Sequence, residues 1–371
     1  MTANAPSQHR MAGLASMAGT TIEWYDFFLY GTAAALVFNK LFFPALDPLS
    51  GVLAAFATYA VGFIGRPLGG IVFGHFGDKV GRKSMLILTL LMMGVPTVLI
   101  GLIPTYESIG YWAAVLLVTL RFMQGIAVGG EWGGAVLMAV EHAPEGRKGF
   151  YGSLPQTGVG AGLVLSTLAM TAVSNLSEED MLSWGWRLPF LASSVLLIVG
   201  WLIRVKVAES PDFERLQKAA SAQSAAAKTA SEPAPAKLPI KIVLRDHRRA
   251  VLTIIGARMA ENAWFYLAAT FALAYTTGQL GLPRADVLSA ITAGAALSLI
   301  TMPLAGWLSD RIGQKRLYLI GMTLLMLYVW PFFALLGSRD LHQVWVAMVV
   351  ALGVVFPLMY APESQLFARQ F

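Results

Sequence analysis

Two acidic residues interrupt the first long apolar segment of this 371-residue chain. Glu23 and Asp26 stand three positions apart, and Tyr30 follows one helical turn later, so on a helix the three side chains lie on one face. Two neighbouring carboxylates hold one proton more tightly than either would alone, which suits a group that takes up and releases a proton near neutral pH. The spacing therefore predicts a pair that carries or couples a proton. The alternative is that one carboxylate only neutralises an arginine on a neighbouring segment.

A second polar face belongs to the fourth long apolar segment, where Arg121, Gln124 and Glu131 follow one drifting helical stripe. A guanidinium can hold a carboxylate through two parallel hydrogen bonds, so Arg121 is suited to an anionic metabolite or to a proton-carrying acid. We therefore predict that Arg121 and Glu131 take part in proton coupling together with Glu23 and Asp26. The alternative is a buried Arg121 that pairs with Asp26 or Glu131 for neutralisation alone.

Other polar and aromatic residues in apolar segments are candidates for contacting a substrate. Arg258, Glu261 and Asn262 share a helical face, although Arg258 and Glu261 can also satisfy each other within one helix. Aromatic residues beside these charges either shape a cavity or lie at the membrane interface. The predicted substrate contacts are Tyr30, Arg66, Arg121, Gln124, Arg258, Glu261, Asn262 and Tyr266. The scattered histidines lack the spacing of a metal site, so none is predicted.

Composition excludes several classes of protein. Hydrophobic residues make up 56% of the chain and charged residues 13%, whereas soluble domains carry about 25% charged residues. The net charge of +6 is scattered between apolar segments, which argues against a nucleic-acid partner. The absence of cysteine excludes disulfides and thiolate chemistry, and no Gly-Lys-Ser or Gly-Lys-Thr loop suggests the use of ATP. We expect no enzyme and no cofactor.

Ten segments are long and apolar enough to predict membrane-spanning helices, because about 20 residues of helix cross the apolar core of a bilayer. They are residues 11–38, 52–76, 84–104, 110–138, 150–174, 186–205, 249–277, 286–308, 317–337 and 342–367. With the amino terminus in the cytoplasm, only Lys40, Arg284 and Arg339 fall in outer segments among the basic residues outside the spans. This asymmetry predicts a multi-pass inner-membrane protein with a cytoplasmic amino terminus.

The chain also contains a repeat. Residues 74–83, with Gly74, Asp78 and Gly81, are echoed by residues 306–315, with Asp310 and Gly313. Each copy lies between two apolar segments, which predicts two related halves.

The predicted domains are residues 1–205, a cytoplasmic linker at 206–248, and residues 249–371. The linker is rich in Ala, Ser, Lys and Pro and is expected to be a flexible tether, or to carry short interfacial helices at its ends.

Several motifs together resemble one family. They are residues 74–83 with their repeat, and residues 23–30, 66–70, 121–134 and 184–190. These stretches are similar to the metabolite:proton symporters of the major facilitator superfamily, particularly to the shikimate-type members. The resemblance implies an all-helical fold of two six-helix lobes with a binding site between them, and it points to Arg121 for proton transfer. Ten spans instead of twelve would leave the second lobe incomplete, so we expect a chain truncated after its tenth helix.

The same resemblance implies that the repeated motif is a conformational latch between the lobes. Within the first copy, the glycines are expected to permit tight turning, and Asp78 to accept hydrogen bonds from a helix amino terminus. Asp310 and Arg311 are expected to meet the start of the fifth span, near residues 147–150. The predicted latch residues are Gly74, Asp78, Gly81, Arg82, Lys83, Gly306, Asp310, Arg311 and Gly313.

These observations predict a proton-coupled symporter of a small organic metabolite, such as shikimate or a dicarboxylate. It would act by alternating access as a monomer in the lipid bilayer and be driven by the proton gradient. The alternatives are a symporter of a zwitterionic osmolyte such as proline or betaine, and a truncated membrane protein without transport, either a nonfunctional fragment or a sensor or scaffold.

Overall fold

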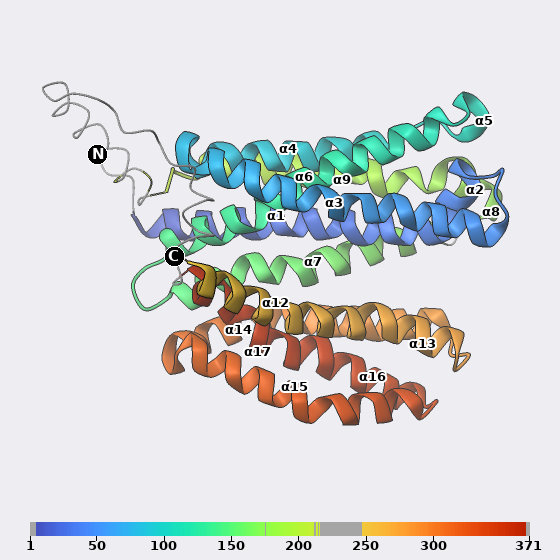
Figure 1. The fold of residues 1–371 in the computed structure, drawn as a ribbon. Coiled ribbons are helices and arrows are strands. Elements are labelled where there is room, and N and C mark those ends of the chain that lie inside the picture. Colours follow the sequence, from blue (N-terminus) through green and yellow to red (C-terminus); the bar gives the residue numbers. More distant parts are fainter. Residues whose placement is uncertain (1–4, 175, 211–212, 214, 216–246, 369–371) are drawn as a thin grey trace, which may run out of the picture.

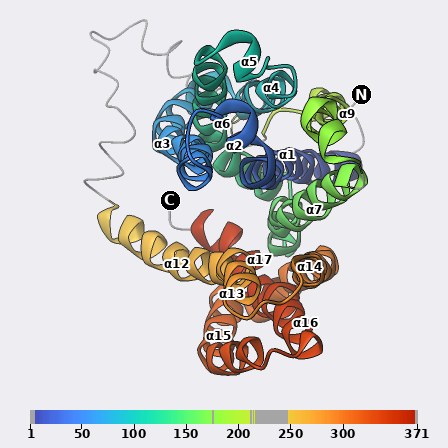
Figure 2. The ribbon, with the colours of Figure 1, turned by 90° about the vertical axis from the view of Figure 1, so that its right-hand side faces the viewer.

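The computed structural model describes residues 5–174, 176–210, 213, 215 and 247–368. Figure 1 shows long helices that run along a common direction in two bundles, and Figure 2 shows the same two groups from one end. The first bundle contains α1 (Ala5–Ala33), η1 (Ala34–Phe38), α2 (Asn39–Phe42), α3 (Pro48–Val80), α4 (Arg82–Ile100), α5 (Tyr106–Ile109), α6 (Trp112–Glu141), α7 (Lys148–Ser174), α8 (Glu178–Asp180), η2 (Met181–Gly185) and α9 (Arg187–Lys206). The second contains α12 (Arg248–Tyr266), η3 (Leu267–Phe271), α13 (Ala272–Gly278), α14 (Arg284–Ile312), α15 (Gln314–Gly337), α16 (Leu341–Val350), η4 (Ala351–Val355) and α17 (Phe356–Ala368). The predicted linker falls almost wholly outside the described residues.

Within the part of the chain that the structure describes, eight helices are long and apolar enough to cross a membrane: α3, α4, α6, α7, α9, α14, α15, and α16 with its continuation into α17. The predicted count of ten is therefore not confirmed. The segments predicted as the first and seventh spans are helical, but α1 carries Glu23 and Asp26, and α12 carries Arg258 and Glu261. These charges make both helices less apolar than the other eight. The predicted truncation after a tenth helix, and with it the incomplete second lobe, depended on that count and is not supported.

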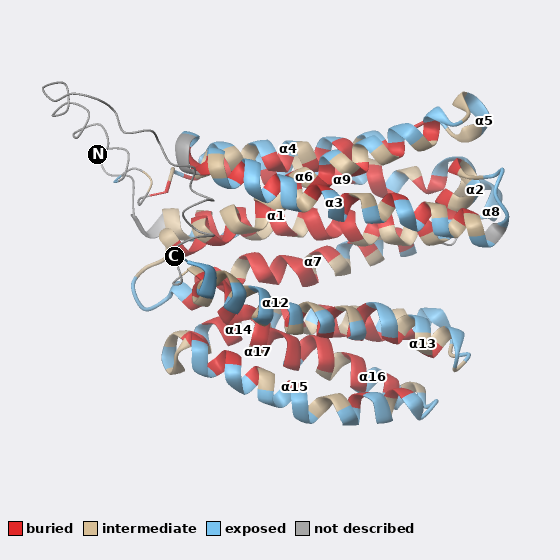
Figure 3. Ribbon diagram, in the orientation of Figure 1, coloured by how far each residue is buried: buried red, intermediate tan, exposed pale blue. Residues whose placement is uncertain are grey.

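The outer faces of the bundles are apolar. Figure 3 shows exposed positions along the outward sides of α3 and α15, whereas buried positions dominate α7 and α17 between the bundles. Exposed residues on the outer helices include Leu68, Ile71, Met326 and Trp330. A continuous apolar exterior of this kind suits lipid rather than water.

The sequence repeat is also a structural repeat. In the first bundle, α3 ends at Val80, Gly81 has a φ of 112°, and α4 begins at the next residue. In the second, α14 ends at Ile312, Gly313 has a φ of 96°, and α15 follows in the same way. Both turns need a left-handed backbone conformation that glycine adopts without strain. The turn thus depends on Gly81 and Gly313; Gly74 and Gly306 lie inside helices, so the expectation that Gly74 serves the turn is wrong.

The interior of the first bundle depends on direct backbone contact between α3 and α6. A Cβ atom added at Gly129 would collide with the carbonyl oxygen of Arg66, and one added at Gly125 would collide with that of Gly62. Small residues at such positions let two helices approach until their backbones touch. This close approach fixes Arg121 of α6 beside α3.

The two bundles touch along a contact that we call the seam, formed by residues 149–160 of α7 and 298–310 of α14. A Cβ at Gly160 would collide with Ser298, and one at Gly306 would collide with Ser153. Further along the same two helices, a cavity of about 880 Å³ separates Thr167 and Thr171 of α7 from Leu288 and Thr292 of α14, and it also borders η1 and η2. The bundles are thus closed against each other at one end and apart at the other.

The α3–α6 contact gives a stability prediction. We expect Gly129→Ala to destabilise the protein by about 1–3 kcal/mol, because the added methyl group must push two helix backbones apart. Thermal unfolding of the purified protein in detergent would measure this loss. Gly133→Ala on the same helix is the matched control, since a Cβ there meets no atom within 4 Å. Equal melting temperatures for the two variants would contradict the packing argument.

Candidate functional site

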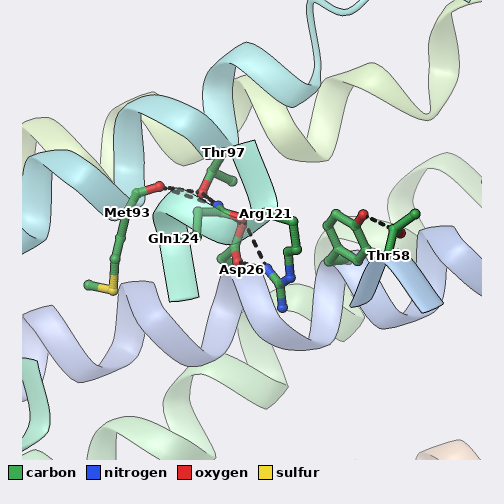
Figure 4. A network of polar contacts seen from close by, with 7 residues as sticks. Asp26, Thr58, Met93, Thr97, Arg121 and Gln124 are labelled. Carbon is green, nitrogen blue, oxygen red and sulfur yellow. Dashed lines mark hydrogen bonds and ion pairs between the residues drawn. The ribbon is translucent and has the colours of Figure 1, made fainter. Parts of the chain in front are cut away.

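Asp26 is the centre of a buried polar network in the first bundle (Figure 4). Its Oδ2 accepts a hydrogen bond from Nη1 of Arg121 at 2.6 Å. Its Oδ1 lies 2.7 Å from both Nε2 of Gln124 and Oγ1 of Thr97. The side chains come from α1, α4 and α6, so three helices meet on one carboxylate. The ion pair is charge-assisted and buried, which strengthens its hydrogen bonds.

Arg121 is held on its other side by aromatic rings. Its guanidinium carbon lies 4.3 Å from the ring centre of Tyr30 and 5.0 Å from that of Tyr59. The hydroxyl of Tyr30 lies 2.6 Å from that of Thr58, which fixes the ring. Cation–π contacts favour a positive charge even when its carboxylate partner is neutralised. Arg121 can therefore remain charged in place if Asp26 takes up a proton.

A small cavity of about 10 Å³ adjoins this network, enough for about one water molecule. Glu23, Asp26, Arg66 and Arg121 all line it. Glu23 is 5% exposed and its Oε2 has no hydrogen-bond partner, while its strongest attraction is to the charge of Arg66. The structure thus brings the predicted pair, Glu23 and Asp26, to one cavity, and of these two carboxylates it is Asp26 that forms an ion pair with Arg121.

Glu131 lies elsewhere. It is fully buried and forms an ion pair with Arg204 of α9, whose Nη1 is 3.1 Å from Oε2, and it accepts a hydrogen bond of 2.6 Å from Thr89. Gly19 of α1 makes room for the pair, because a Cβ there would collide with both partners. Glu131 therefore does not contact Arg121 and does not line the cavity beside Asp26.

The candidate substrate residues of α12 form a separate cluster. Nη1 of Arg258 lies 3.2 Å from Oε2 of Glu261 and 2.7 Å from Oε2 of Glu363 on α17. Asn262 donates to the backbone carbonyl of Arg258 within the helix, and Tyr266 is partly buried in the second bundle. Arg258 and Glu261 thus form the expected ion pair within α12, but Arg258 also has a second carboxylate partner, Glu363 of α17.

The first copy of the repeated motif is tied within its own bundle. Arg82 forms an ion pair with Glu141 at the end of α6, and the carboxylate of Glu209 accepts hydrogen bonds from the backbone nitrogens of Arg82 and Lys83 at 3.1 Å. Nζ of Lys83 donates to the carbonyl of Val205. The side chain of Asp78 lies outside what the structure describes. The described contacts of this copy therefore hold α4 against α6 and α9.

The second copy joins the two bundles. The carboxylate of Asp310 accepts hydrogen bonds from the backbone nitrogens of Gly149 at 2.6 Å and Phe150 at 2.8 Å, at the start of α7. A carboxylate at a helix amino terminus satisfies free N–H groups and interacts favourably with the helix dipole. The guanidinium of Arg311 lies 3.9 Å from the ring centre of Trp307 in its own helix. Asp310 thus contacts the start of α7, where its partner was predicted. The cation–π contact of Arg311 with Trp307 lies within α14.

Several residues of these networks were not among the predicted sites: Thr97, Tyr59, Thr89, Arg204 and Glu363. Arg204 and Glu363 stand near the ends of predicted spans, where an ionisable residue reads as an interfacial one. Both residues nevertheless lie inside predicted spans, where each buried charge needs a partner of opposite sign. Matching the acidic residues of the spans to the basic ones would therefore have included Arg204 and Glu363. Hydroxyl and aromatic residues such as Thr97 and Tyr59 are common in apolar helices, so their partners follow only from the fold.

Comparison with known proteins supports one family. A model of the Major Facilitator Superfamily matches residues 16–371. The shikimate transporter of Escherichia coli K12 is 44% identical over 98% of this chain and 81% of its own length. The inner membrane metabolite transport protein YhjE of the same organism is 38% identical over 96% and 80%. The proline/betaine transporter of E. coli K12 is 34% identical over 92% and 67%.

A solved structure shares the fold. The proton:xylose symporter XylE superposes with a TM-score of 0.74 over 97% of this chain and 82% of its own, at 16% sequence identity. These matches extend over both bundles. With eight apolar helices and this similarity, the protein is a multi-pass membrane transporter, and its inner-membrane location fits its E. coli relatives. The chain belongs to the Major Facilitator Superfamily.

Proposed function

We propose that this protein couples the entry of a small organic anion to the entry of a proton by alternating access. The observation that carries the proposal is the ion pair of Asp26 and Arg121, buried where α1, α4 and α6 meet. A buried pair of this kind can exchange one partner for another: a proton can replace Arg121 on Asp26, and an anion can replace Asp26 on Arg121. Binding of the proton and of the anion then favour each other.

The order of events follows from the partners of each group. When Asp26 is protonated, its attraction for Arg121 falls, while Tyr30 and Tyr59 still hold the guanidinium in position. An uncompensated charge in the apolar interior costs at least ~2.5 kcal/mol on insertion scales. An anionic substrate beside Arg121 removes that cost. Arg66, which lies across the small cavity next to Glu23, supplies a second positive charge for the anion.

The similarity to the shikimate transporter favours a carboxylate substrate such as shikimate. A dicarboxylate fits the same charge argument, because Arg66 and Arg121 both line the small cavity, which must widen to admit a substrate. The similarity to the proline/betaine transporter favours a zwitterion as the second candidate. A zwitterion also presents a carboxylate to Arg121, so the two candidates differ in what contacts Glu23.

We also propose that the amino terminus is cytoplasmic and that the protein is a monomer with lobes at 1–205 and 249–371. In this orientation the seam closes the cytoplasmic side, and the cavity beside Thr167 and Leu288 faces outward. Two of the three basic residues predicted outside, Lys40 and Arg284, line that cavity. Lys40 is paired there with Glu178, so Arg284 supplies the positive charge that raises the local concentration of an anion before it reaches Arg121.

The proton-coupling role of Asp26 gives the first transport prediction. In proteoliposomes, Asp26→Asn should lower shikimate uptake driven by a proton gradient at least about tenfold, since a hydrogen bond to a charged group contributes ~1.5–3 kcal/mol. Exchange of internal for external shikimate needs no net proton movement and should be kept. Uptake by Asp26→Asn that still follows the gradient would contradict coupling through this residue, and no shikimate uptake by the unaltered protein would leave the zwitterion as substrate.

Arg121 gives a second prediction. Arg121→Lys keeps the charge but loses the planar group that stacks on Tyr30 and reaches Asp26. We expect the KM for shikimate in exchange assays to rise about tenfold or more, because loss of about 1.4 kcal/mol of binding changes affinity by that factor. Lys83→Arg at the membrane boundary is the control for a basic exchange outside the cavity. A KM unchanged by Arg121→Lys would show that the anion binds elsewhere.

The latch role of Asp310 gives a third prediction. The chain has no cysteine, so Ser153→Cys places a single thiol in the seam. Asp310→Asn should raise its labelling rate by a soluble maleimide about two- to fivefold, since the charge at the α7 amino terminus contributes ~0.3–1 kcal/mol to closure.

Asp340→Asn is the matched control, because Asp340 caps α16 within a single bundle. The protein is labelled in lipid nanodiscs, which give the maleimide access from both sides of the membrane. The labelling rate of Ser153→Cys is divided by that of a variant with a single exposed thiol, Ser338→Cys. An identical rise for Asp310→Asn and Asp340→Asn would contradict a latch at the seam.

A further inference from the structure

The cluster around Arg258 contains two carboxylates for one guanidinium. Nη1 of Arg258 is the shared partner of Glu363 at 2.7 Å and Glu261 at 3.2 Å. The two acidic side chains are 0% and 3% exposed, whereas 28% of the Arg258 side chain remains exposed. Oε1 of Glu363 is buried and has no hydrogen-bond partner. An oxygen in that position is available to carry a proton.

A balance of buried charges leads to the same cluster. Among the described residues, five carboxylates are buried: Glu23, Asp26, Glu131, Glu261 and Glu363. Asp26 pairs with Arg121, Glu131 pairs with Arg204, and Glu23 is attracted mainly by Arg66. Within the described part of the chain, Glu261 and Glu363 have Arg258 as their single ion-pair partner. The cluster therefore holds one negative charge in excess unless one of its carboxylates is protonated, and an excess buried charge is costly.

This cluster also lies against the seam. The guanidinium of Arg258 is 4.7 Å from the ring centre of Trp132, which belongs to α6 of the first bundle. Trp132 donates to Oε1 of Gln156 at 3.0 Å, and Gln156 of α7 in turn contacts the carbonyl of Tyr360 on α17. Arg258 thus connects the two carboxylates of its own bundle to an aromatic residue of the other.

Other titratable groups face the cluster and belong to its charge balance. Tyr360 of α17 and Tyr318 of α15 interact electrostatically with Arg258, Glu261 and Glu363. Tyr266 of α12, and Glu23 of α1 in the other bundle, also interact with Arg258; Arg66 acts on Tyr266 and Glu23, whereas Arg258 is the basic residue that acts on Glu261 and Glu363. None of these adds a positive charge to the cluster.

We propose that Glu261 and Glu363 share a second exchangeable proton, and that its binding favours closure of the seam. This proposal rests on the proposed transport function for its role in the cycle. With the proton bound, the cluster is one guanidinium, one carboxylate and one carboxylic acid, and it is neutral. After the proton is lost, the extra negative charge is stabilised by water, which reaches the cluster when the two bundles separate. Higher pH should therefore favour the open seam.

The proton site can be tested without transport. Infrared difference spectra of the full chain in lipid nanodiscs, recorded as pH is raised, would follow the carbonyl band of a protonated carboxyl group. We expect part of this band to be lost in Glu363→Gln, in Glu261→Gln or in both, and retained in Asp26→Asn. Loss in either variant with the helical spectrum unchanged locates the proton. Retention of the whole band in both glutamine variants would overturn the proposal.

The effect on the seam has its own readout. Labelling of Ser153→Cys, relative to the exposed Ser338→Cys, should increase as pH rises in the otherwise unaltered chain. Glu363→Gln mimics the protonated acid, so the relative labelling rate should stay low and lose at least about half of its dependence on pH. A dependence unchanged by both Glu363→Gln and Glu261→Gln would contradict control of the seam. If the unaltered protein transports neither shikimate nor a zwitterion, yet the band is lost in a glutamine variant, the proposed function falls while the proton site stands.

Discussion

The pairing of charges in an apolar interior is the constraint on which the rest of this structure depends. A single charge near the middle of a membrane is costly, yet carboxylates and guanidinium groups occur in α1, α3, α6, α9, α12 and α17. Each charge needs a partner on a neighbouring helix, so the pairs decide which helices meet. Asp26 brings α1 to α6 through Arg121, and Glu131 brings α6 to α9 through Arg204.

These pairs divide into structural and exchangeable ones by what surrounds them. Glu131 has its oxygens satisfied by Arg204 and Thr89, and no cavity adjoins it among those described. Asp26 and Arg121 border a cavity, and the Arg258 cluster leaves an oxygen without a partner. The proposed cycle needs both kinds, because in it a bundle stays rigid while its site changes protonation. Glycine packing contributes to the rigid part of the bundle. It fixes α3 against α6 through backbone contact, so no polar group is needed to hold these two helices together.

Much of the architecture follows from the sequence, because the helices are long and apolar and the motif at residues 74–83 is repeated. Three residues of the Asp26 network could also be predicted from the sequence, since Asp26, Arg121 and Gln124 are polar residues of a kind that is unusual in apolar segments. Which of them pair with one another could not be predicted. Whether Arg121 meets Asp26 or Glu131 depends on helix rotation of some tens of degrees, which the drifting stripe on α6 leaves open. The predicted count of ten spans is not confirmed for a related reason: the buried charges of α1 and α12 make these two helices less apolar than the others.

The repeat shows how one backbone device can serve two purposes. Both copies use a glycine with positive φ to join two helices, but the polar contacts around them differ. Around the first, Arg82 and Glu209 tie the turn to its own bundle; around the second, Asp310 reaches across the seam. At the start of α15, Gln314 bonds to Gln365 where the first copy has the ion pair of Arg82 and Glu141. A neutral pair lacks the long-range attraction of an ion pair. The turn at Gly313 therefore binds its own bundle more weakly than the turn at Gly81 does. Its charged contact, through Asp310, connects the two bundles instead.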